Sequence, residues 1–486
     1  MDYMPVLYIT ILTSVAVSVS IATFISRFLG FSRDLVRRIF QISLVIMLIL
    51  TLYQMYALYQ SGYAVALLSG FRLLSPDNVS LIAVLGILLG GFIALSSYPY
   101  ERGAYEIVLA VSLLGILGSV LVSMAVDFIT LIVLWTLISL ASYSVIALAR
   151  DPESLDASSR YIIVGVLASQ FLLLGVGLLI IYLRSLPGSF YISSDVSRVL
   201  PLISLAFILG ALGFKLGSAP FHFWIPDVYG RASPYAIAMI AGSIKLGLVV
   251  FLARLVLGFK GYDPLFYMIA LLSILSMIIG SITPLTQGNI QRILAFSSVN
   301  HIGFILIGVS VLSLSIPPSG YYIYSLAMAG ISLHILSYAM SKSSLFSLVG
   351  FIRSSTGSPE LSVISKNLQS SPELRFSAVL HLANLIGVPP LPGFWSKLFI
   401  FLSAAYSDPR LYIAGVPWLV VMGVIASVFS VFYYLNIIRA LYLERSSESN
   451  GGGSLSRDVF YPYIASILLI IIGSVIPVIL VFMGFL

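Results

Sequence analysis

Four lysines lie inside runs of apolar residues, where a permanent charge is costly. Lys215, Lys245, Lys342 and Lys397 stand within stretches long enough to cross a bilayer, whereas the other 21 of the 25 basic residues fall between such stretches or at their ends. A charged lysine at the bilayer centre costs about 3 kcal/mol or more. Lysine is also the cation that burial can neutralise, so a buried lysine can take up and release a proton. The four lysines therefore indicate a proton relay.

Two structural explanations compete with a relay. A lysine near the end of a span can extend to the lipid headgroups, and this explanation fits Lys342 better than Lys215 or Lys397. A buried lysine can also form a structural salt bridge. No Asp or Glu lies in the middle of any apolar run, so the chain offers no partner at that depth.

The four histidines also lie in or at the edge of apolar runs; they are His222, His301, His334 and His381. Histidine titrates near neutral pH and can therefore extend a proton path. A lone buried histidine is more often structural. His301 and His334 fall between Lys215 and Lys397 in the sequence, together with two further lysines, and both roles stay open for them.

Prolines break the helices beside two of the lysines. Pro220 has no N–H, so the carbonyl of Leu216 loses its helical partner. Such a break is tolerated in a membrane only where protein or water satisfies the freed group. We therefore expect a polar cavity beside Lys215. The stretch "NLIGVPPLPGFWSKLFIF" repeats the pattern, with Pro389 and Pro390 just before Lys397.

These residues must be positioned by membrane-spanning helices. The chain has 486 residues, of which 59% are hydrophobic and 9% charged, against about 25% charged in a soluble domain. Runs of roughly 20 apolar residues recur along its length. The spacing predicts an all-α polytopic membrane protein with spans at 4–27, 38–60, 77–98, 104–125, 127–149, 160–183, 199–219, 234–257, 264–284, 293–314, 321–350, 376–404, 412–438 and 459–484. Polar segments 353–374 and 444–458 are predicted to be mobile loops, and no soluble domain is expected.

Loop charges predict the orientation. If the N-terminus lies outside, cytoplasmic loops hold 15 basic residues and external loops hold 6. The positive-inside rule then places both termini on the external side of the membrane. The first span lacks a basic leader and a small-residue cleavage site, so we expect it to be retained as a helix.

The two broken spans, the seventh and the twelfth, predict an internal repeat. An odd offset of five spans means that the repeated units are inverted in the membrane, and broken helices at matching positions of inverted repeats indicate an ion path near the midplane. We expect helices 1–3 at 1–98, a first five-helix repeat (spans 4–8) at 99–258, a second repeat (spans 9–13) at 259–443, and a polar loop with helix 14 at 444–486.

Composition excludes several classes of function. The chain has no cysteine, so it holds no disulfide, thiolate nucleophile or cysteine-ligated iron–sulfur cluster. It has no phosphate-binding glycine motif of the Walker or dinucleotide type. The net charge of +7 is spread over short loops and does not indicate nucleic-acid binding. No metal site is expected.

Five stretches resemble the antiporter-like membrane subunits of complex I, a family shared with Mrp cation/proton antiporters and membrane-bound hydrogenases. They are "GFKLGSAPFHFWIPDVYGRAS", "AGSIKLGLVVFLARL", "GNIQRILAFSSVNHIGFILIG", "LHILSYAMSKSSLF" and "GVPPLPGFWSKLFIF". The resemblance covers spans 4 to 13. The stretch "SVFSVFYYLNIIRALYL" and an end after span 14 make the chain most similar to the N-type subunit.

The resemblance implies a role for each buried ionisable group. Lys215 and Lys245 would be the input-side and central lysines, His301, His334 and Lys342 would link the two halves, and Lys397 would lie at the exit. Pro220, His222, Pro389 and Pro390 would support the breaks. The implied function is proton translocation by a non-redox subunit of a prokaryotic plasma-membrane NADH:quinone oxidoreductase. Quinone, flavin and iron–sulfur centres would then belong to other membrane and peripheral subunits, with no cofactor on this chain.

One position departs from the family. Its members usually carry a glutamate in the fifth helix, in a "WELxSL"-like stretch, and here "LIVLWTLISL" has Thr136 in that place. Asp127 lies about 13.5 Å away on the opposite face and cannot replace it. Lys215 is thus expected to lack its carboxylate unless a neighbouring subunit supplies one. Two alternatives to pumping in complex I are a subunit of a Mrp-type sodium/proton antiporter or hydrogenase-like complex, and a structural spacer that has lost pumping.

Overall fold

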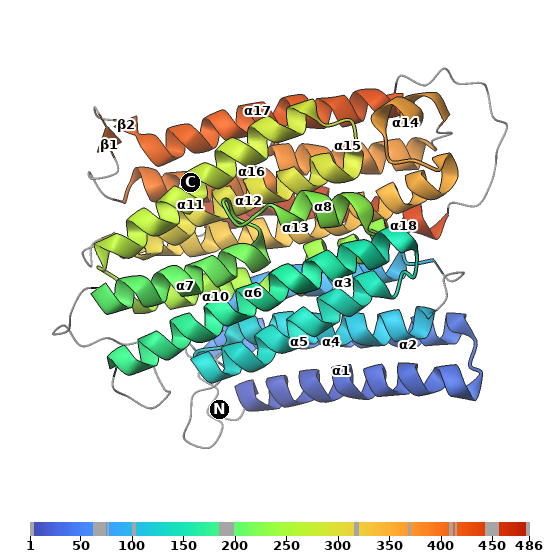
Figure 1. The fold of residues 1–486 in the computed structure, drawn as a ribbon, viewed down its shortest axis with the longest axis horizontal. Helices are drawn as coiled ribbons and strands as arrows, with labels where there is room; N and C mark the ends of the chain where they lie inside the picture. Colours follow the sequence, from blue (N-terminus) through green and yellow to red (C-terminus); the bar gives the residue numbers. More distant parts are fainter. Residues whose placement is uncertain are drawn as a thin grey trace.

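The fold is a bundle of long helices that lie side by side (Figure 1). The computed structural model describes residues 4–61, 74, 77–99, 104–183, 199–314, 320–367, 371–407, 412–413, 416–442 and 456–482. Its elements are α1 (Met4–Leu29), α2 (Arg33–Ser61), α3 (Asn78–Ser96), α4 (Tyr105–Met124), α5 (Phe128–Ala147), α6 (Pro152–Leu183), α7 (Val199–Leu216), α8 (Trp224–Arg231), α9 (Pro234–Met239), the π-helical segment η1 (Ile240–Ile244), α10 (Gly247–Gly258), α11 (Asp263–Ile282), the 3-10 segment η2 (Thr283–Thr286), α12 (Ile290–Leu312), α13 (Tyr321–Thr356), α14 (Leu361–Asn367), α15 (Pro372–Ile386), α16 (Pro392–Ala405), the paired strands β1 (Tyr412–Ile413) and β2 (Val416–Pro417), α17 (Trp418–Tyr442) and α18 (Arg457–Phe482).

Each predicted span coincides with a helix or a broken helix. Within the described residues, 11 segments are long and apolar enough to cross a membrane, and the shorter apolar helices α3 and α7 add two. The pair α15 and α16, taken as one broken span, makes the fourteenth among the described residues. The all-α polytopic fold class is therefore confirmed, whereas the division into two inverted repeats stays a prediction.

Three segments differ from the sequence-based expectation. The seventh span ends at Leu216 rather than 219, and after a turn the chain forms α8. The eighth span is interrupted by the π-helical η1, whose sequence contains no proline that would predict a break. The predicted mobile loop 353–374 was wrong in part, because α13 continues to Thr356 and α14 occupies 361–367. The loop predicted at 444–458 lies mostly outside the described residues.

Ion pairs fix the short helix α8 against α6. Arg160 and Asp156 of α6 pair with Asp227 and Arg231 of α8 at 3.0–3.2 Å between nitrogen and oxygen. Exposed pairs of this kind contribute only about 0–1 kcal/mol each. The cluster therefore orients α8 more than it stabilises the bundle.

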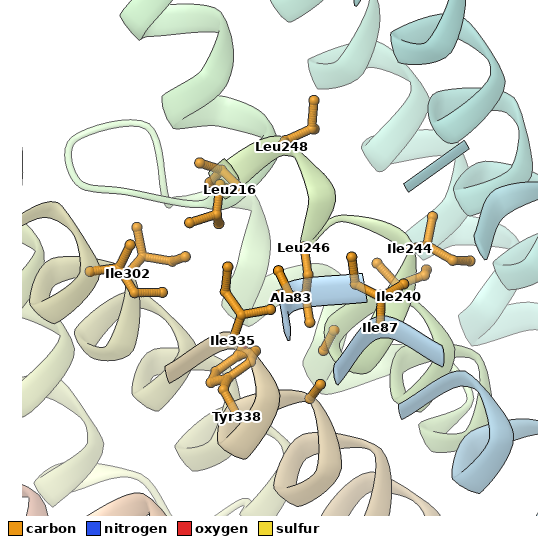
Figure 2. Packing of buried hydrophobic residues seen from close by; sticks show 14 of the residues in the cluster. Ala83, Ile87, Leu216, Ile240, Ile244, Leu246, Leu248, Ile302, Ile335 and Tyr338 are labelled. Carbon is orange, nitrogen blue, oxygen red and sulfur yellow. The ribbon is translucent and has the colours of Figure 1, made fainter. Parts of the chain in front are cut away.

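The helix α13 runs through the centre of the molecule. It spans 36 residues and packs against α3, α9, α16 and α18. Figure 2 shows an apolar cluster in this region, where Leu216, Leu246, Ile302 and Ile335 come from α7, the turn after η1, α12 and α13. Each of these four residues directly follows an ionisable one in the sequence; the ionisable residues are Lys215, Lys245, His301 and His334. Successive residues point about 100° apart round a helix, so the ionisable side chains point away from this apolar cluster.

Glycine allows α3 and η1 to approach backbone to backbone. A Cβ added at Gly90 would lie 2.2 Å from the carbonyl oxygen of Gly242, and one added at Gly242 would lie 1.8 Å from Oγ of Ser343. Both contacts are too short for any side chain. The two glycines therefore bring α3, η1 and α13 together just before Lys245.

Candidate functional site

The first break places Lys215 in an aromatic and hydroxyl-lined environment. Its ammonium donates to Oγ of Ser139 at 3.0 Å and Oγ of Ser142 at 3.5 Å, both on α5. The rings of Tyr143 and Tyr161 lie 4.7 and 5.0 Å from Nζ. Lys215 is 2% exposed. Its neighbours within the described residues therefore stabilise the cation with dipoles and π-faces and supply no carboxylate.

The carbonyl freed by Pro220 is satisfied by the next lysine. Lys245 is 1% exposed, and its Nζ donates to the carbonyl oxygen of Leu216 at 3.2 Å. Protein thus fills the vacancy where the sequence predicted a polar cavity, because the side chain of Lys245 is long enough to reach the break from η1 and α10. The break after α7 is thus stabilised by the lysine of the next span, Lys245.

A serine from α4 holds the interruption that precedes Lys245. Oγ of Ser119 donates to the carbonyl oxygen of Ser243 at 2.9 Å and accepts the N–H of Gly247 at 2.9 Å. The Ser119 hydroxyl therefore binds one backbone group before Lys245 and one after it, where the regular helical hydrogen bonds are interrupted. Single π-helical turns commonly occur at functional sites.

Lys342 lies deep within α13 and is 0% exposed. Its ammonium donates to the carbonyl oxygen of Leu294 at 2.6 Å and to Oγ of Ser297, both on α12. The ring of Tyr338 lies 5.6 Å from Nζ. This position excludes the extension to lipid headgroups that its neighbouring serines had left open.

His301 and His334 contact each other directly. Nδ1 of His301 lies 3.0 Å from Nε2 of His334, so one ring donates a hydrogen to the other. The outer nitrogens continue the chain, because Nε2 of His301 lies 3.2 Å from the hydroxyl of Tyr434 and Nδ1 of His334 lies 3.0 Å from Oγ of Ser396. Four side chains from α12, α13, α16 and α17 thus form a continuous hydrogen-bonded row.

The second break is closed by its own lysine. Nζ of Lys397 donates to the carbonyl oxygens of Leu385 at 3.0 Å and Ile386 at 2.8 Å. These are the carbonyls four residues before Pro389 and Pro390, and hence the two that the prolines deprive of a helical donor. Gly387 ends α15 in the left-handed region with a φ of 93°. A lysine ammonium therefore replaces two missing backbone N–H groups.

The two breaks are related but not identical. Both lie where a proline interrupts a span, and in both a lysine ammonium binds a freed carbonyl. Lys215 precedes its break, whereas Lys397 follows its break on α16. The freed carbonyl of Leu216 consequently binds a lysine from another helix, Lys245.

Contacts between neighbouring helices join the ionisable groups into one row. The segment η1, which precedes Lys245, packs against α13, which carries Lys342. The ring of Phe304 lies 4.5 Å from Nζ of Lys397 and 5.8 Å from the ring of His301. Lys215 joins the row through Leu216, its neighbour in sequence. The structure thus brings all six predicted relay residues into one buried series. None of the ion pairs among the described residues involves one of the four lysines.

A family model covers the whole of this series. The model described as "NADH:quinone oxidoreductase/Mrp antiporter, TM" matches residues 125–430, which is more than half of the 486-residue chain. The chain belongs to this family. All six residues of the series, from Lys215 near the end of α7 to Lys397 on α16, lie within the matched region.

Two relatives of known name are similar to this chain over most of its length. NADH-quinone oxidoreductase subunit N of Laribacter hongkongensis is 31% identical over 404 residues, which are 80% of this chain and 78% of that protein. Subunit N of Hydrogenovibrio crunogenus is 29% identical over 380 residues, 76% of this chain and 75% of that protein.

Solved structures of less similar sequence share the fold. A chain of respiratory complex I from Thermus thermophilus has a TM-score of 0.76 at 23% identity, covering 96% of this chain and 98% of that one. A chain of the Mrp complex from Dietzia sp. DQ12-45-1b has a TM-score of 0.80 at 18% identity, covering 96% and 95%. This chain therefore shares its fold with a chain of each of these two complexes.

Thr136 and His222 lie apart from the row. Thr136 is exposed on the outer face of α5, and its hydroxyl donates to the carbonyl oxygen of Ile132 at 2.9 Å. At the position where the family usually carries glutamate, this chain therefore has a side chain bonded to its own helix. His222 is half-buried in the turn after Pro220, with its ring 6.4 Å from that of Phe296.

Several polar groups of the site were missed in the sequence; they are Ser139, Ser142, Ser297, Ser396 and Tyr434. Serine is frequent in these helices, so nothing in a single sequence marks the few that face a lysine. The three-residue spacing of Ser139 and Ser142 on one face of α5 was the one available signal.

The described residues hold no group of three or more His, Asp or Glu that could bind a metal ion. The buried oxygens that contact the lysines are hydroxyls and carbonyls. The ionisable groups of the site are amines and imidazoles.

Proposed function

We propose that this chain is an N-type, proton-translocating subunit of a complex I-like quinone oxidoreductase, and that protons move along Lys215, Lys245, Lys342, His301, His334 and Lys397. Membership of the family and its relatives named as subunit N support the assignment. The chain has no cysteine, so it cannot hold an iron–sulfur cluster through thiolates.

The main support for the proposed proton relay is the kind of atom that binds each lysine. Each of the four lysines is held by neutral oxygens, as at Ser139, Leu216, Leu294 and Leu385. A carboxylate would hold a buried lysine in its charged form. A hydroxyl or carbonyl accepts a hydrogen from the charged ammonium and from the neutral amine alike. The lysines can therefore change protonation state without losing their hydrogen bonds.

Unpaired hydroxyls near the lysines support a hydrated path. The side-chain oxygens of Ser344, Ser347 and Tyr229 are buried without a hydrogen-bond partner among the described residues. The ring of Tyr229 lies 5.5 Å from Nζ of Lys245, and Ser344 and Ser347 follow Lys342 on α13. Buried polar groups normally bind protein or water, so water molecules in this region would complete them.

A sodium path is less well supported. Sodium, like other hard cations, is bound by several oxygen ligands such as carboxylates and carbonyls. Here the freed carbonyls of Leu216, Leu385 and Ile386 are already occupied by lysine ammonium groups. The arrangement favours protons over metal cations.

The test is proton pumping by the assembled complex in sealed vesicles. Lys215→Ala and Lys397→Ala are each expected to lower the number of protons pumped per electron pair while the complex still assembles. Lys215→Arg should also impair pumping, because arginine does not deprotonate in proteins.

The matched control is Lys260→Ala, which removes an exposed lysine outside the row. It should leave the stoichiometry unchanged. If both Lys215→Ala and Lys397→Ala pumped the wild-type number of protons per electron pair, the proposed relay would be wrong.

A further inference from the structure

Three aromatic rings surround the Lys215 ammonium and form an aromatic box. The ring centroids of Tyr143, Tyr161 and Trp135 lie 4.7, 5.0 and 5.8 Å from Nζ. A cation within about 6 Å of a ring centroid is attracted by the negative π-face. Each of the other three relay lysines has only one or two rings this close within the described residues. The two tyrosine rings are nearly perpendicular, at 87°, and therefore make two adjoining walls of the box.

Lys215 also differs from the other relay lysines in its hydrogen bonds. The other three each donate to at least one backbone carbonyl. Within the described residues, Lys215 donates only to the hydroxyls of Ser139 and Ser142, at 3.0 and 3.5 Å. A carbonyl freed at a helix end, such as that of Leu216, carries a partial negative charge that a serine hydroxyl lacks. The aromatic box therefore supplies negative potential where carbonyls supply it for the other lysines.

The surrounding packing gives both tyrosine rings defined positions. The indole of Trp224 stacks on Tyr161, with centroids 4.4 Å apart and planes inclined by 14°. Trp224 begins α8, and its Nε1 donates to the carbonyl oxygen of Phe214 at 2.7 Å, so the stack is fixed to the break after α7. Gly165 of α6 makes room for Tyr143, because a Cβ at that position would overlap the tyrosine hydroxyl.

We propose that Tyr143 and Tyr161 are positioning residues that favour the protonated form of Lys215 and thereby set the highest pH at which this lysine takes up a proton. The inference rests on the proton relay proposed above. Burial without a carboxylate favours the neutral amine. The π-faces oppose this preference more weakly than an anion would, so Lys215 can both accept a proton and release it.

Other titratable groups do not supply this stabilisation. Within the described residues, the groups that face Lys215 are the two tyrosines and, across the carbonyl of Leu216, Lys245. Lys245 is itself a cation when protonated and would oppose a charge on Lys215. The ionisable residues of the helices that pack against α7 lie toward the helix ends; they are Glu153, Asp156, Arg160 and Tyr182 of α6, Arg254 of α10, and Asp263 and Tyr267 of α11.

The experiment replaces each tyrosine, in the assembled complex, with phenylalanine and with phenylalanines that carry one, two or three ring fluorines. Fluorine withdraws electrons from the ring, so each added fluorine weakens the attraction for a cation while the ring keeps nearly the same size. The measured quantity is the alkaline limit, the pH above which proton pumping per electron pair in sealed vesicles falls below half of its maximum.

Tyr143→Phe and Tyr161→Phe retain the π-face and should keep the alkaline limit close to the wild-type value. Each fluorine should then lower this limit, and three fluorines at either position should lower it by about one pH unit, a tenfold change in proton uptake. The direction follows because a weaker π-face favours the neutral amine, so Lys215 would take up its proton only at lower pH.

The matched control is Tyr182, a buried tyrosine of α6 whose ring does not lie close to a lysine within the described residues. The same fluorinated series at Tyr182 should leave the alkaline limit unchanged. An alkaline limit that does not depend on fluorine at Tyr143 or Tyr161, in a complex that Lys215→Ala impairs, would overturn the role of the rings and leave the relay intact. Wild-type pumping by Lys215→Ala at every pH would instead contradict the proposed function of Lys215.

Discussion

At the Lys215 ammonium, two serine hydroxyls of α5 stand where a carboxylate would fix the charge. Ser139 is the nearer, at 3.0 Å, whereas Thr136 faces outward and bonds to Ile132. Removing one hydrogen-bond acceptor from a buried amine costs about 1 kcal/mol, or roughly fivefold in an equilibrium. We therefore expect Ser139→Ala to slow pumping severalfold and Thr136→Val to leave it within twofold, measured in sealed vesicles. The opposite ranking would show that the outer face of α5 serves Lys215.

A second prediction concerns the hydrogen-bonded row of Tyr434, His301, His334 and Ser396. His334 contacts both His301 and Ser396, so His334→Phe breaks the row at its centre. Pumping should fall at least fivefold, while the complex still assembles and transfers electrons at a residual rate. His381 is an equally buried histidine outside the row, bonded to the carbonyl oxygen of Pro462 at 3.0 Å. His381→Asn should therefore keep the pumping stoichiometry of whatever complex assembles.

At the scale of helices, a proline break and a lysine act together. Pro389 and Pro390 deprive Leu385 and Ile386 of backbone donors, and Lys397 supplies the donors instead. The double variant Pro389→Ala/Pro390→Ala returns two N–H groups that compete for these carbonyls. We expect it to impair pumping although Lys397 is retained, as measured by acidification of vesicles per quinone reduced.

The control for this variant is another proline of the same broken span. Pro372 lies in the first turn of α15, where a missing N–H leaves no helical carbonyl unpaired. Pro372→Ala should leave pumping unchanged. Equal activity of the double proline variant and the wild type would show that the break at α15 and α16 is not required.

At the scale of the whole molecule, the fourteen predicted spans would return the chain to the side where it began. Loop charges predict that this side is external. The chain has no cysteine, so single cysteines report topology without background from this subunit. In intact cells, a membrane-impermeant maleimide should label Lys260→Cys and Tyr406→Cys, and should label Ser32→Cys and Ser355→Cys only after lysis. All four residues are exposed in the isolated chain. Labelling of the second pair in intact cells would reverse the orientation.

The sequence alone was enough for the long helices and for the four buried lysines. Long apolar runs must be helical in a membrane, because every backbone group has to be satisfied locally. A lysine in such a run is costly enough to be conspicuous, so Lys215, Lys245, Lys342 and Lys397 stood out without a structure. Pro220, Pro389 and Pro390 marked the broken helices for the same local reason, the loss of a backbone donor.

Tertiary structure decided which groups meet. Hydrogen bonds such as Lys245 to Leu216 or His301 to His334 join residues on different helices, and their geometry depends on how those helices rotate and cross. A serine costs little to bury and is common in this chain, so its sequence position does not reveal whether it faces a lysine, as Ser139 does, or lipid. The π-helical turn before Lys245 likewise follows from packing against α3 and α4, since no local residue forces it. Sequence thus determined what is buried, by the free energy of transfer into lipid, and the packing of helices determined what each buried group touches.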